Sequence, residues 1–133
     1  MVPDSDLKSI LDNDMQKFAN ILNATNSNIA TAGTDYSKMY YYASQAKSQL
    51  QDLLSAIEAL SVTEGSNGAI VKQDVENAIQ TEILVQSIYE DAMKDSMDND
   101  LSASNQKLQE AIDLRKIYEF DYVDRYNSDK NKL

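Results

Sequence analysis

The sequence predicts an all-α fold, an antiparallel up-down-up-down four-helix bundle that forms one domain over residues 1–133. The first observation is a series of amphipathic stretches of nearly equal length, approximately residues 5–32, 35–61, 69–97 and 101–127. Within each stretch apolar residues recur every three or four positions. The second observation is a composition with only three Gly and one Pro, so few residues interrupt these stretches. Antiparallel helices bury one another fully only when their lengths match, which favours a bundle.

The first predicted helix, residues 5–32, lies between Pro3 and Gly33. Pro is favoured at the start of a helix and Gly just past its end. Asn23 begins a glycosylation acceptor triplet, but we expect Thr25 to face the core and therefore interpret the match as coincidental. The core-facing side is formed by Leu7, Leu11, Met15, Phe18, Leu22, Thr25, Ile29 and Ala32.

The second predicted helix, residues 35–61, has the most regular apolar side. Thr34 or Asp35 is suited to cap its first turn. The segment that follows, residues 62–68, contains two of the three Gly residues and is the clearest loop in the chain. The apolar side of this helix consists of Tyr36, Met39, Ala43, Ala46, Leu50, Leu53, Ile57 and Leu60.

The third and fourth predicted helices, residues 69–97 and 101–127, meet at a boundary without Gly or Pro. Residues 94–104 are rich in Asp, Asn and Ser, which favour caps and turns, so we expect a helix to end there. A continuous helix would instead be a rod about 85 Å long, and the chain would be a structural spacer that dimerises. The apolar sides are Val71, Val75, Ala78, Ile79, Val85, Tyr89, Ala92 and Met93, then Leu101, Leu108, Ala111, Ile112, Tyr118, Tyr122 and Tyr126.

Two charged residues, Glu82 and Arg115, interrupt the apolar sides of the last two helices. At about 100° per residue, each points to the middle of its apolar side. In an antiparallel pair with aligned midpoints they also lie at the same height. We therefore predict a buried ion pair with a structural role, which fixes the register of the helices. Two alternatives remain: one of the charges contacts a polar ligand, or both side chains extend to the surface.

Tyrosines gather toward both ends of the predicted bundle. Tyr36, Tyr40 and Tyr89 are expected near the end that holds the first and third connections. Tyrosines at helical spacing usually belong to the core or to its boundary. The functional alternative is a ligand-binding cleft lined by these three residues, where Thr25 and Ala43 leave room between the helices.

The residue types that most enzymes use are missing, since the chain has no His and no Cys. Without them it can form neither the Glu-x-x-His pairs of di-iron bundles nor a Ser-His-Asp or Cys-His arrangement. It also has no Gly-rich phosphate-binding loop. We therefore expect no enzymatic activity, no catalytic residues, no metal and no cofactor. The acidic stretch from Asp91 to Asp100 departs from the EF-hand pattern and is interpreted as helix termination and capping, with weak divalent-cation binding as the alternative.

The net charge of −10 bears on possible partners. It disfavours nucleic acid, because contacts to phosphates require clustered Lys and Arg, and it disfavours an anionic membrane surface. No run approaches the roughly 20 apolar residues that span a bilayer, so we do not expect a membrane-spanning helix. A basic protein partner is compatible with this charge. Both a monomer and a homodimer are compatible with the sequence.

In helix number, helix length and a composition rich in Asn, Ser, Gln and Thr, the chain resembles extracytoplasmic four-helix sensor domains and helical surface lipoproteins. The resemblance implies a non-enzymatic binding module, secreted or tethered to a membrane, that engages a small ligand or a protein. The alternative hypothesis is a cytoplasmic acidic adaptor or inhibitor that binds a basic protein surface. It is favoured by the charge and by the lack of a signal-peptide pattern in the sequence.

Overall fold

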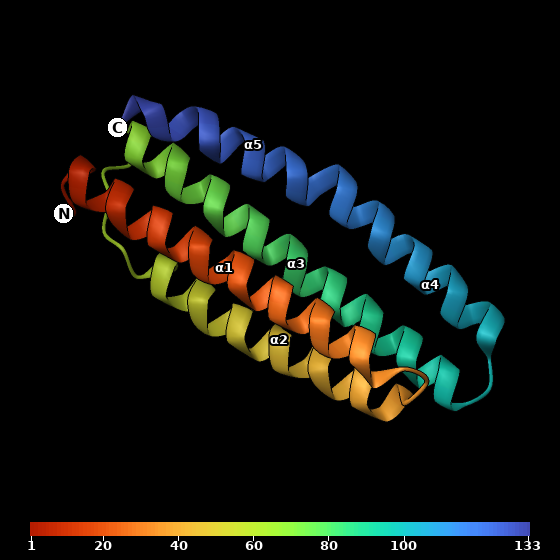
Figure 1. The fold of residues 1–133 in the computed structure, drawn as a ribbon. Coiled ribbons are helices and arrows are strands. Elements are labelled where there is room, and N and C mark those ends of the chain that lie inside the picture. The colour runs from red at the N-terminus through yellow and green to blue at the C-terminus, as the bar shows by residue number, and fades with distance from the viewer.

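The computed structural model describes residues 1–133, except for the side chain of Glu119. Within these residues the chain forms antiparallel helical rods and no strand, which confirms the predicted four-helix bundle (Figure 1). The helices are α1 Asp4–Ala32, α2 Tyr36–Glu58, α3 Asn67–Met97, α4 Leu101–Leu114 and α5 Phe120–Asp129. A π-helical turn, Arg115–Glu119, joins α4 to α5, so that these three elements form one rod, the fourth of the bundle. Both termini lie at the same end of the bundle (Figure 1).

Side-chain caps define where α2, α3 and α4 begin. Asp35, Ser66 and Asp100 each accept a hydrogen bond of 3.1 Å from a backbone N–H three residues further along the chain. Such caps satisfy donors that the first turn of a helix leaves without a partner. The short polar residues between the apolar stretches therefore set the helix boundaries.

The end of α2 differs from the prediction, because the helix stops at Glu58 and does not continue to Ser61. The carbonyl of Ser61 accepts a 2.9 Å hydrogen bond from the backbone N–H of Val2, which holds this segment out of the helix. The flanking Leu60 and Val62 pack against the core from the loop. Burial of two apolar side chains thus favours an early end to the helix.

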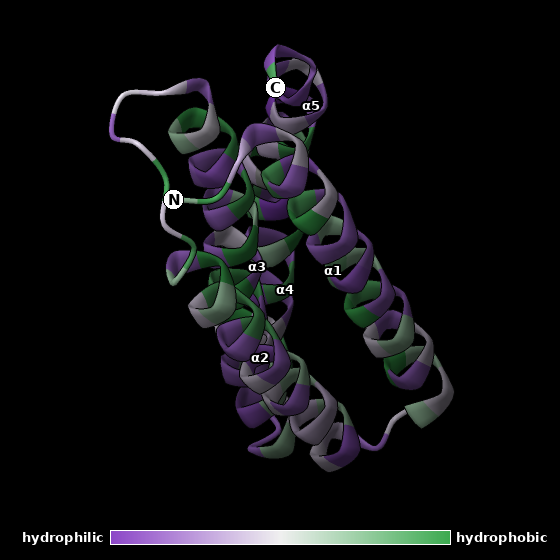
Figure 2. Ribbon diagram, turned by 90° about the vertical axis from the view of Figure 1, so that its left-hand side faces the viewer, coloured by the Kyte–Doolittle hydropathy of each residue, from purple (hydrophilic) through white to green (hydrophobic). Residues whose placement is uncertain are grey.

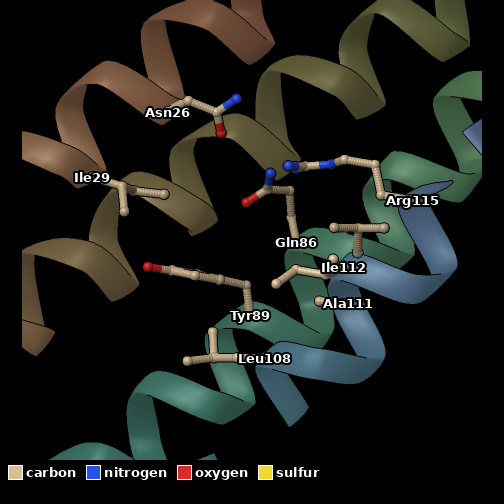
Figure 3. A pocket seen from close by; sticks show the side chains of 9 residues that line it. Asn26, Ile29, Gln86, Tyr89, Leu108, Ala111, Ile112 and Arg115 are labelled. Carbon is tan, nitrogen blue, oxygen red and sulfur yellow. The ribbon is translucent and has the colours of Figure 1, made fainter. Parts of the chain in front are cut away.

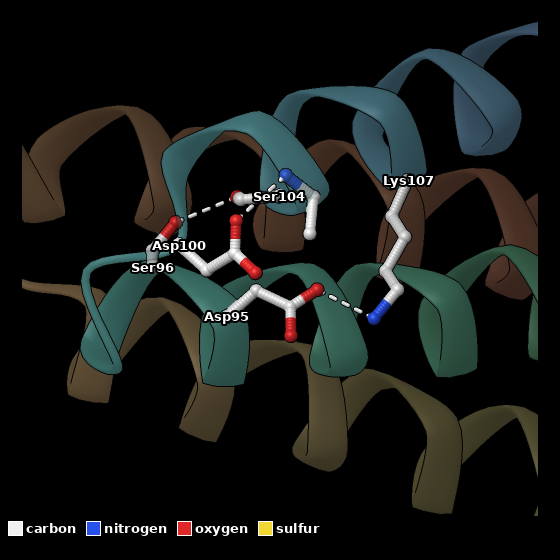
Figure 4. Close-up of polar contacts among 6 residues, drawn as sticks. Asp95, Ser96, Asp100, Ser104 and Lys107 are labelled. Carbon is white, nitrogen blue, oxygen red and sulfur yellow. Dashed lines mark hydrogen bonds and ion pairs between the residues drawn. The ribbon is translucent and has the colours of Figure 1, made fainter.

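The predicted break between the third and fourth helices is present, so the continuous rod does not form. α3 ends at Met97, and Asn99 has a positive φ of 60°, a conformation that Asn tolerates better than most residues. Just inside the turn, the buried hydroxyls of Ser96 and Ser104 share a 2.6 Å hydrogen bond that joins the two helices (Figure 4). The spacer interpretation, which depended on one long helix, is therefore wrong.

Helix α3 lies at the centre of the packing (Figure 1). It packs along α2 on one side and along the fourth rod on the other, and α1 packs mainly on α2. The helix accordingly buries residues on more than one side, including polar ones. Its buried residues are Gly68, Val71, Asp74, Val75, Ala78, Ile79, Glu82, Val85, Gln86, Glu90, Ala92, Met93 and Ser96.

The apolar side predicted for the fourth helix is only partly buried. Ala111 and Tyr126 are buried, whereas Tyr118 is 46% exposed and Ile112 is 47% exposed. The prediction assumed a uniform α-helical repeat, but the π turn has i→i+5 hydrogen bonds and therefore holds an extra residue. Tyr118, within this turn, is therefore rotated away from the position that an uninterrupted helix would give it, whereas Ile112 precedes the turn and Tyr126, beyond it, stays buried.

Candidate functional site

The candidate site is a cavity of about 310 Å³ between α1, α3 and the fourth rod (Figure 3). This volume falls at the lower end of the range of about 300–1,000 Å³ that is usual for small-molecule pockets. Its walls are mostly apolar, with a few polar groups. The lining residues are Asn26 and Ile29 from α1, Val85, Gln86 and Tyr89 from α3, and Leu108, Ala111, Ile112 and Arg115 from the fourth rod.

The position of α1 creates this cavity. α1 packs on α2 and, less extensively, on α3, whereas its backbone contacts with α4 and α5 are sparse. Figure 2 shows that α1 inclines away from the other helices toward its C-terminal end. Between α1 and the fourth rod the small side chains of Val85 and Ala111 form part of the wall. The helices on either side therefore leave space that side chains do not fill.

Gln86 is the most deeply buried polar residue that lines the cavity, at 2% exposure. Its Nε2 donates a 3.0 Å hydrogen bond to Oε1 of Glu82, one turn earlier on α3. Its Oε1 has no hydrogen-bond partner among the atoms that the structure describes. Figure 3 shows the Gln86 amide extending from α3 toward the side of the cavity where Asn26 lies. A buried acceptor without a partner is costly, which makes this atom a candidate contact for a ligand.

Glu82 and Arg115 form an ion pair beside this cavity. Glu82 is 0% exposed, and its carboxylate accepts hydrogen bonds from Nε of Arg115 at 3.1 Å and from Nη2 of the same guanidinium. Such a two-point contact fixes the plane of the guanidinium and compensates the buried charge. The pair carries no net charge, and Arg115, the first residue of the π turn, reaches the cavity wall with its side chain.

Of the residues predicted to bind a ligand, the structure brings only Tyr89 to this cavity. Tyr89 is half-buried, and loss of solvent raises the pKa of its hydroxyl, which keeps the group neutral. Tyr36 and Tyr40 are half-buried on α2, and the ring of Tyr40 lies 5.4 Å from Nζ of Lys94. Thr25 is buried on α1. These three residues are not among the lining residues, so they do not form one cleft with Tyr89.

Gln86 and Ala111 are lining residues whose role the sequence analysis did not identify. Gln86 lies four residues after Glu82 and three before Tyr89, on the same side of α3. A polar residue such as Gln86 on the otherwise apolar side of a helix could have been recognised from the sequence as a candidate site residue. No comparable signal marked Ala111, because alanine is common in any helix and its small volume matters only when the opposite helix is known.

A second, more open cavity of about 470 Å³ lies between α1 and α5. At its edge the hydroxyl of Tyr126 donates a hydrogen bond to Asp12, and Nζ of Lys130 lies 3.2 Å from the same carboxylate. The hydrogen bond from Tyr126 and the nearby Lys130 lower the pKa of Asp12, although partial burial opposes this. Burial and the hydrogen bond to Asp12 raise the pKa of Tyr126. The apolar wall of this second cavity includes Met15, Phe18, Leu22, Phe120 and Val123.

The acidic stretch at the end of α3 engages neighbouring groups. Asp95 lies 2.5 Å from Nζ of Lys107, and Asp100 caps α4 (Figure 4). Among the residues that the structure describes, no group of three or more carboxylates is arranged to hold a metal ion. The geometry of this stretch is therefore that of a helix end and an interhelical ion pair.

In the described part of the chain, every helix is too short or too polar to cross a membrane. Comparisons of this chain with protein families, with curated proteins and with solved structures found no match. The functional assignment therefore depends on the geometry of the site.

Proposed function

We propose that this chain is a non-enzymatic binding module that holds a small molecule in the cavity between α1, α3 and the fourth rod. The observation that carries the proposal is an apolar cavity of about 310 Å³ with a buried, unsatisfied acceptor, Oε1 of Gln86, in its wall. Cavities between the helices of bundles are frequent binding sites, and a few convergent polar groups usually orient the ligand.

The proposed setting is extracytoplasmic, with the domain secreted or attached to a membrane. The cavity lies toward the half of the bundle away from the termini, since Ile29 is near the end of α1 and Leu108 is in the first half of the fourth rod. A tether at either terminus would therefore leave the cavity accessible (Figure 1). The Asn-, Ser- and Thr-rich sequence of α1 is consistent with this setting.

Binding of indole, followed by chemical shifts of the ¹⁵N-labelled protein, tests the proposal. We expect the resonances of cavity residues such as Val85 and Tyr89 to shift with saturation. Ala111→Leu should abolish this binding because it fills the cavity, while the free volume there limits the strain of overpacking. Ala30→Leu, at an exposed position on α1, is the matched control and should bind as the unmodified protein does. No saturable shift, or unchanged binding in Ala111→Leu, would overturn the proposal.

A second candidate is a cytoplasmic acidic adaptor or inhibitor that binds a basic protein surface. It is favoured by apolar side chains exposed on the fourth rod, with Ile117 at 55% and Phe120 at 56%, in a chain whose net charge is −10. Asp121 and Asp124 are exposed near them. Apolar contacts surrounded by acidic residues suit a basic, amphipathic partner.

A synthetic basic amphipathic helix tests this candidate. Its affinity should fall as NaCl is raised from 50 to 500 mM, as expected for charge-driven association, and should also fall in Phe120→Ser. Ala111→Leu should leave that affinity unchanged, because Ala111 is buried at the cavity. Salt-independent binding would exclude the adaptor. The two candidate functions are distinguished by the variants, since Phe120→Ser should weaken only the binding of the basic helix and Ala111→Leu only the binding of the small molecule.

A further inference from the structure

We infer that the cavity selects an uncharged, largely apolar molecule carrying one N–H or O–H group, and that this group donates a hydrogen bond to Oε1 of Gln86. The inference rests on the proposed function and adds the chemical class of the ligand. It is carried by the position of one side-chain oxygen, by the charge balance of the cavity and by its size.

The Gln86 amide has a fixed orientation. Its Nε2 is held by Glu82 at 3.0 Å, and Glu82 is in turn held by Arg115. The contact with Glu82 uses one of the two N–H donors of Nε2 and sets which side of the amide carries the oxygen, whereas the carbonyl oxygen, which only accepts, makes no such contact. With Gln86 2% exposed, this oxygen has no hydrogen-bond partner among the described protein atoms. A ligand donor would satisfy this oxygen, and a ligand without a donor would leave it unpaired.

The charge balance around the cavity favours a neutral ligand. The only ionised side chain that lines the described cavity is Arg115, and Glu82 already neutralises it through two contacts. The facing half of α1, residues 18–32, contains no Asp, Glu, Lys or Arg. An anionic ligand would have to compete with Glu82 for the guanidinium and would leave the fully buried carboxylate of Glu82 without its cation. A cationic ligand would find no carboxylate among the lining residues.

The volume sets the size of the ligand. An apolar cavity of about 150 Å³ accommodates benzene, and this cavity has about 310 Å³. Two fused rings therefore fit. The Tyr89 ring and the aliphatic side chains of Ile29 and Leu108 supply apolar contacts from three helices (Figure 3).

Indole and benzofuran provide a matched pair of probes, because they have nearly the same shape and only indole has an N–H donor. Titrations of the unmodified protein should show indole binding at least about tenfold more tightly, as expected when one ligand leaves a buried acceptor unpaired. The side-chain amide resonances of Gln86 should shift with indole and much less with benzofuran. Indole-3-carboxylate should bind more weakly than indole.

Gln86→Met tests whether this residue is the source of the selectivity. Met has a similar length and no carbonyl, so the preference for indole should fall to less than about twofold. Gln80→Met, at an exposed position on α3, is the control and should keep the full preference. Circular dichroism of both variants shows whether the fold is retained, and the comparison of probes on the unmodified protein needs no variant.

The outcomes separate this inference from the proposed function. Equal affinity for indole and benzofuran would overturn the assignment of Gln86 and leave the binding module standing. Tighter binding of indole-3-carboxylate than of indole would overturn the neutral ligand class. Failure of both bicyclic probes to bind would overturn the proposed function and this inference together.

Discussion

At the scale of single residues, Glu82 places a charged group in the interior of the bundle. Its carboxylate is fully buried, and its described partners are Arg115 and Gln86. A buried charge that loses its partner is strongly unfavourable, whereas replacing both members of a buried pair by apolar residues is often neutral or stabilising. The pair therefore contributes more to the uniqueness of the packing than to the net free energy of folding.

Arg115→Leu is predicted to lower the free energy of unfolding by about 3–5 kcal/mol, because it leaves Glu82 buried without its cation. The double variant Glu82→Leu/Arg115→Leu should recover most of this loss. Urea denaturation measures both effects, and Lys116→Leu, at an exposed neighbouring position, is a control expected to stay within about 0.5 kcal/mol. An unchanged midpoint for Arg115→Leu would show that the pair is not a structural requirement.

Asp74 is the second unusual carboxyl group. It is buried on α3, and its Oδ2 has no hydrogen-bond partner in the described structure. Burial, with the neighbouring Asp129 as a further cause, raises its pKa to about 7. The hydrogen bond with Asp74, together with Lys132, lowers the pKa of Asp129. Asp74 therefore keeps its proton at a higher pH than an exposed aspartate does, whereas Asp129 is ionised more readily.

This pKa predicts a pH dependence of stability. Between about pH 4 and 7 the folded state keeps a proton on Asp74 that the unfolded state has released, so stability from this group is lost as the pH rises. Asp74→Asn, which stays neutral, should melt at a higher temperature than the unmodified protein at pH 8. The difference should shrink toward pH 4. Asp52→Asn, at an exposed position, controls for the loss of one charge. A difference that grew on acidification would contradict this account.

At the scale of elements, the π turn Arg115–Glu119 interrupts the regular helix of the fourth rod. It starts at Arg115, where the ion pair to Glu82 forms, and the second cavity lies immediately beyond it, at Phe120. Arg115, at the start of the turn, lines the first cavity, and Tyr126, beyond it, is buried at the second.

Deletion of Lys116 should be tolerated, because one residue fewer converts the π turn to α-helix and keeps the register on both sides. Deletion of Gln109 in α4 would instead rotate everything beyond it by about 100° and should lower the melting temperature strongly. Thermal melts of the two deletion variants measure the difference. Similar losses in both would show that the extra residue of the π turn is required for packing.

At the scale of the whole molecule, net charge is the dominant electrostatic property. The chain has 22 Asp and Glu against 12 Lys and Arg, so self-repulsion opposes the compact state. Raising NaCl from 10 to 150 mM shortens the Debye length from about 30 Å to about 8 Å. We expect the melting temperature to rise by about 3–5 °C, equivalent to about 1 kcal/mol for a chain of this size.

Two observations would check the cause of this salt effect. Replacing Asp113, Asp121 and Asp124 by Asn should reduce this rise, since all three are exposed acidic residues on the fourth rod. A melting temperature that fell with salt would mean that specific ion pairs, such as those of Glu82 and Glu90, outweigh the general repulsion.

Part of the candidate site was accessible from the sequence. Helical arithmetic placed Glu82 and Arg115 at one height, and these side chains form an ion pair. Tyr89 was selected as a binding residue and lines the cavity. Tyr36 and Tyr40, selected with it, lie on α2, which does not border this cavity. The height of a residue along the bundle was thus predictable from the sequence. Which other helix that residue faces was not.

The sequence by itself determined the four rods, their direction and most of their limits, because apolar periodicity and short polar caps act within one helix or between consecutive helices. Tertiary structure decided that α3 is central, that α1 stays apart from the fourth rod, and that a π turn interrupts that rod. The physical reason is that α1 and the fourth rod are separated by two helices along the chain. Their spacing depends on the packing of all the helices together, and that spacing creates the cavity.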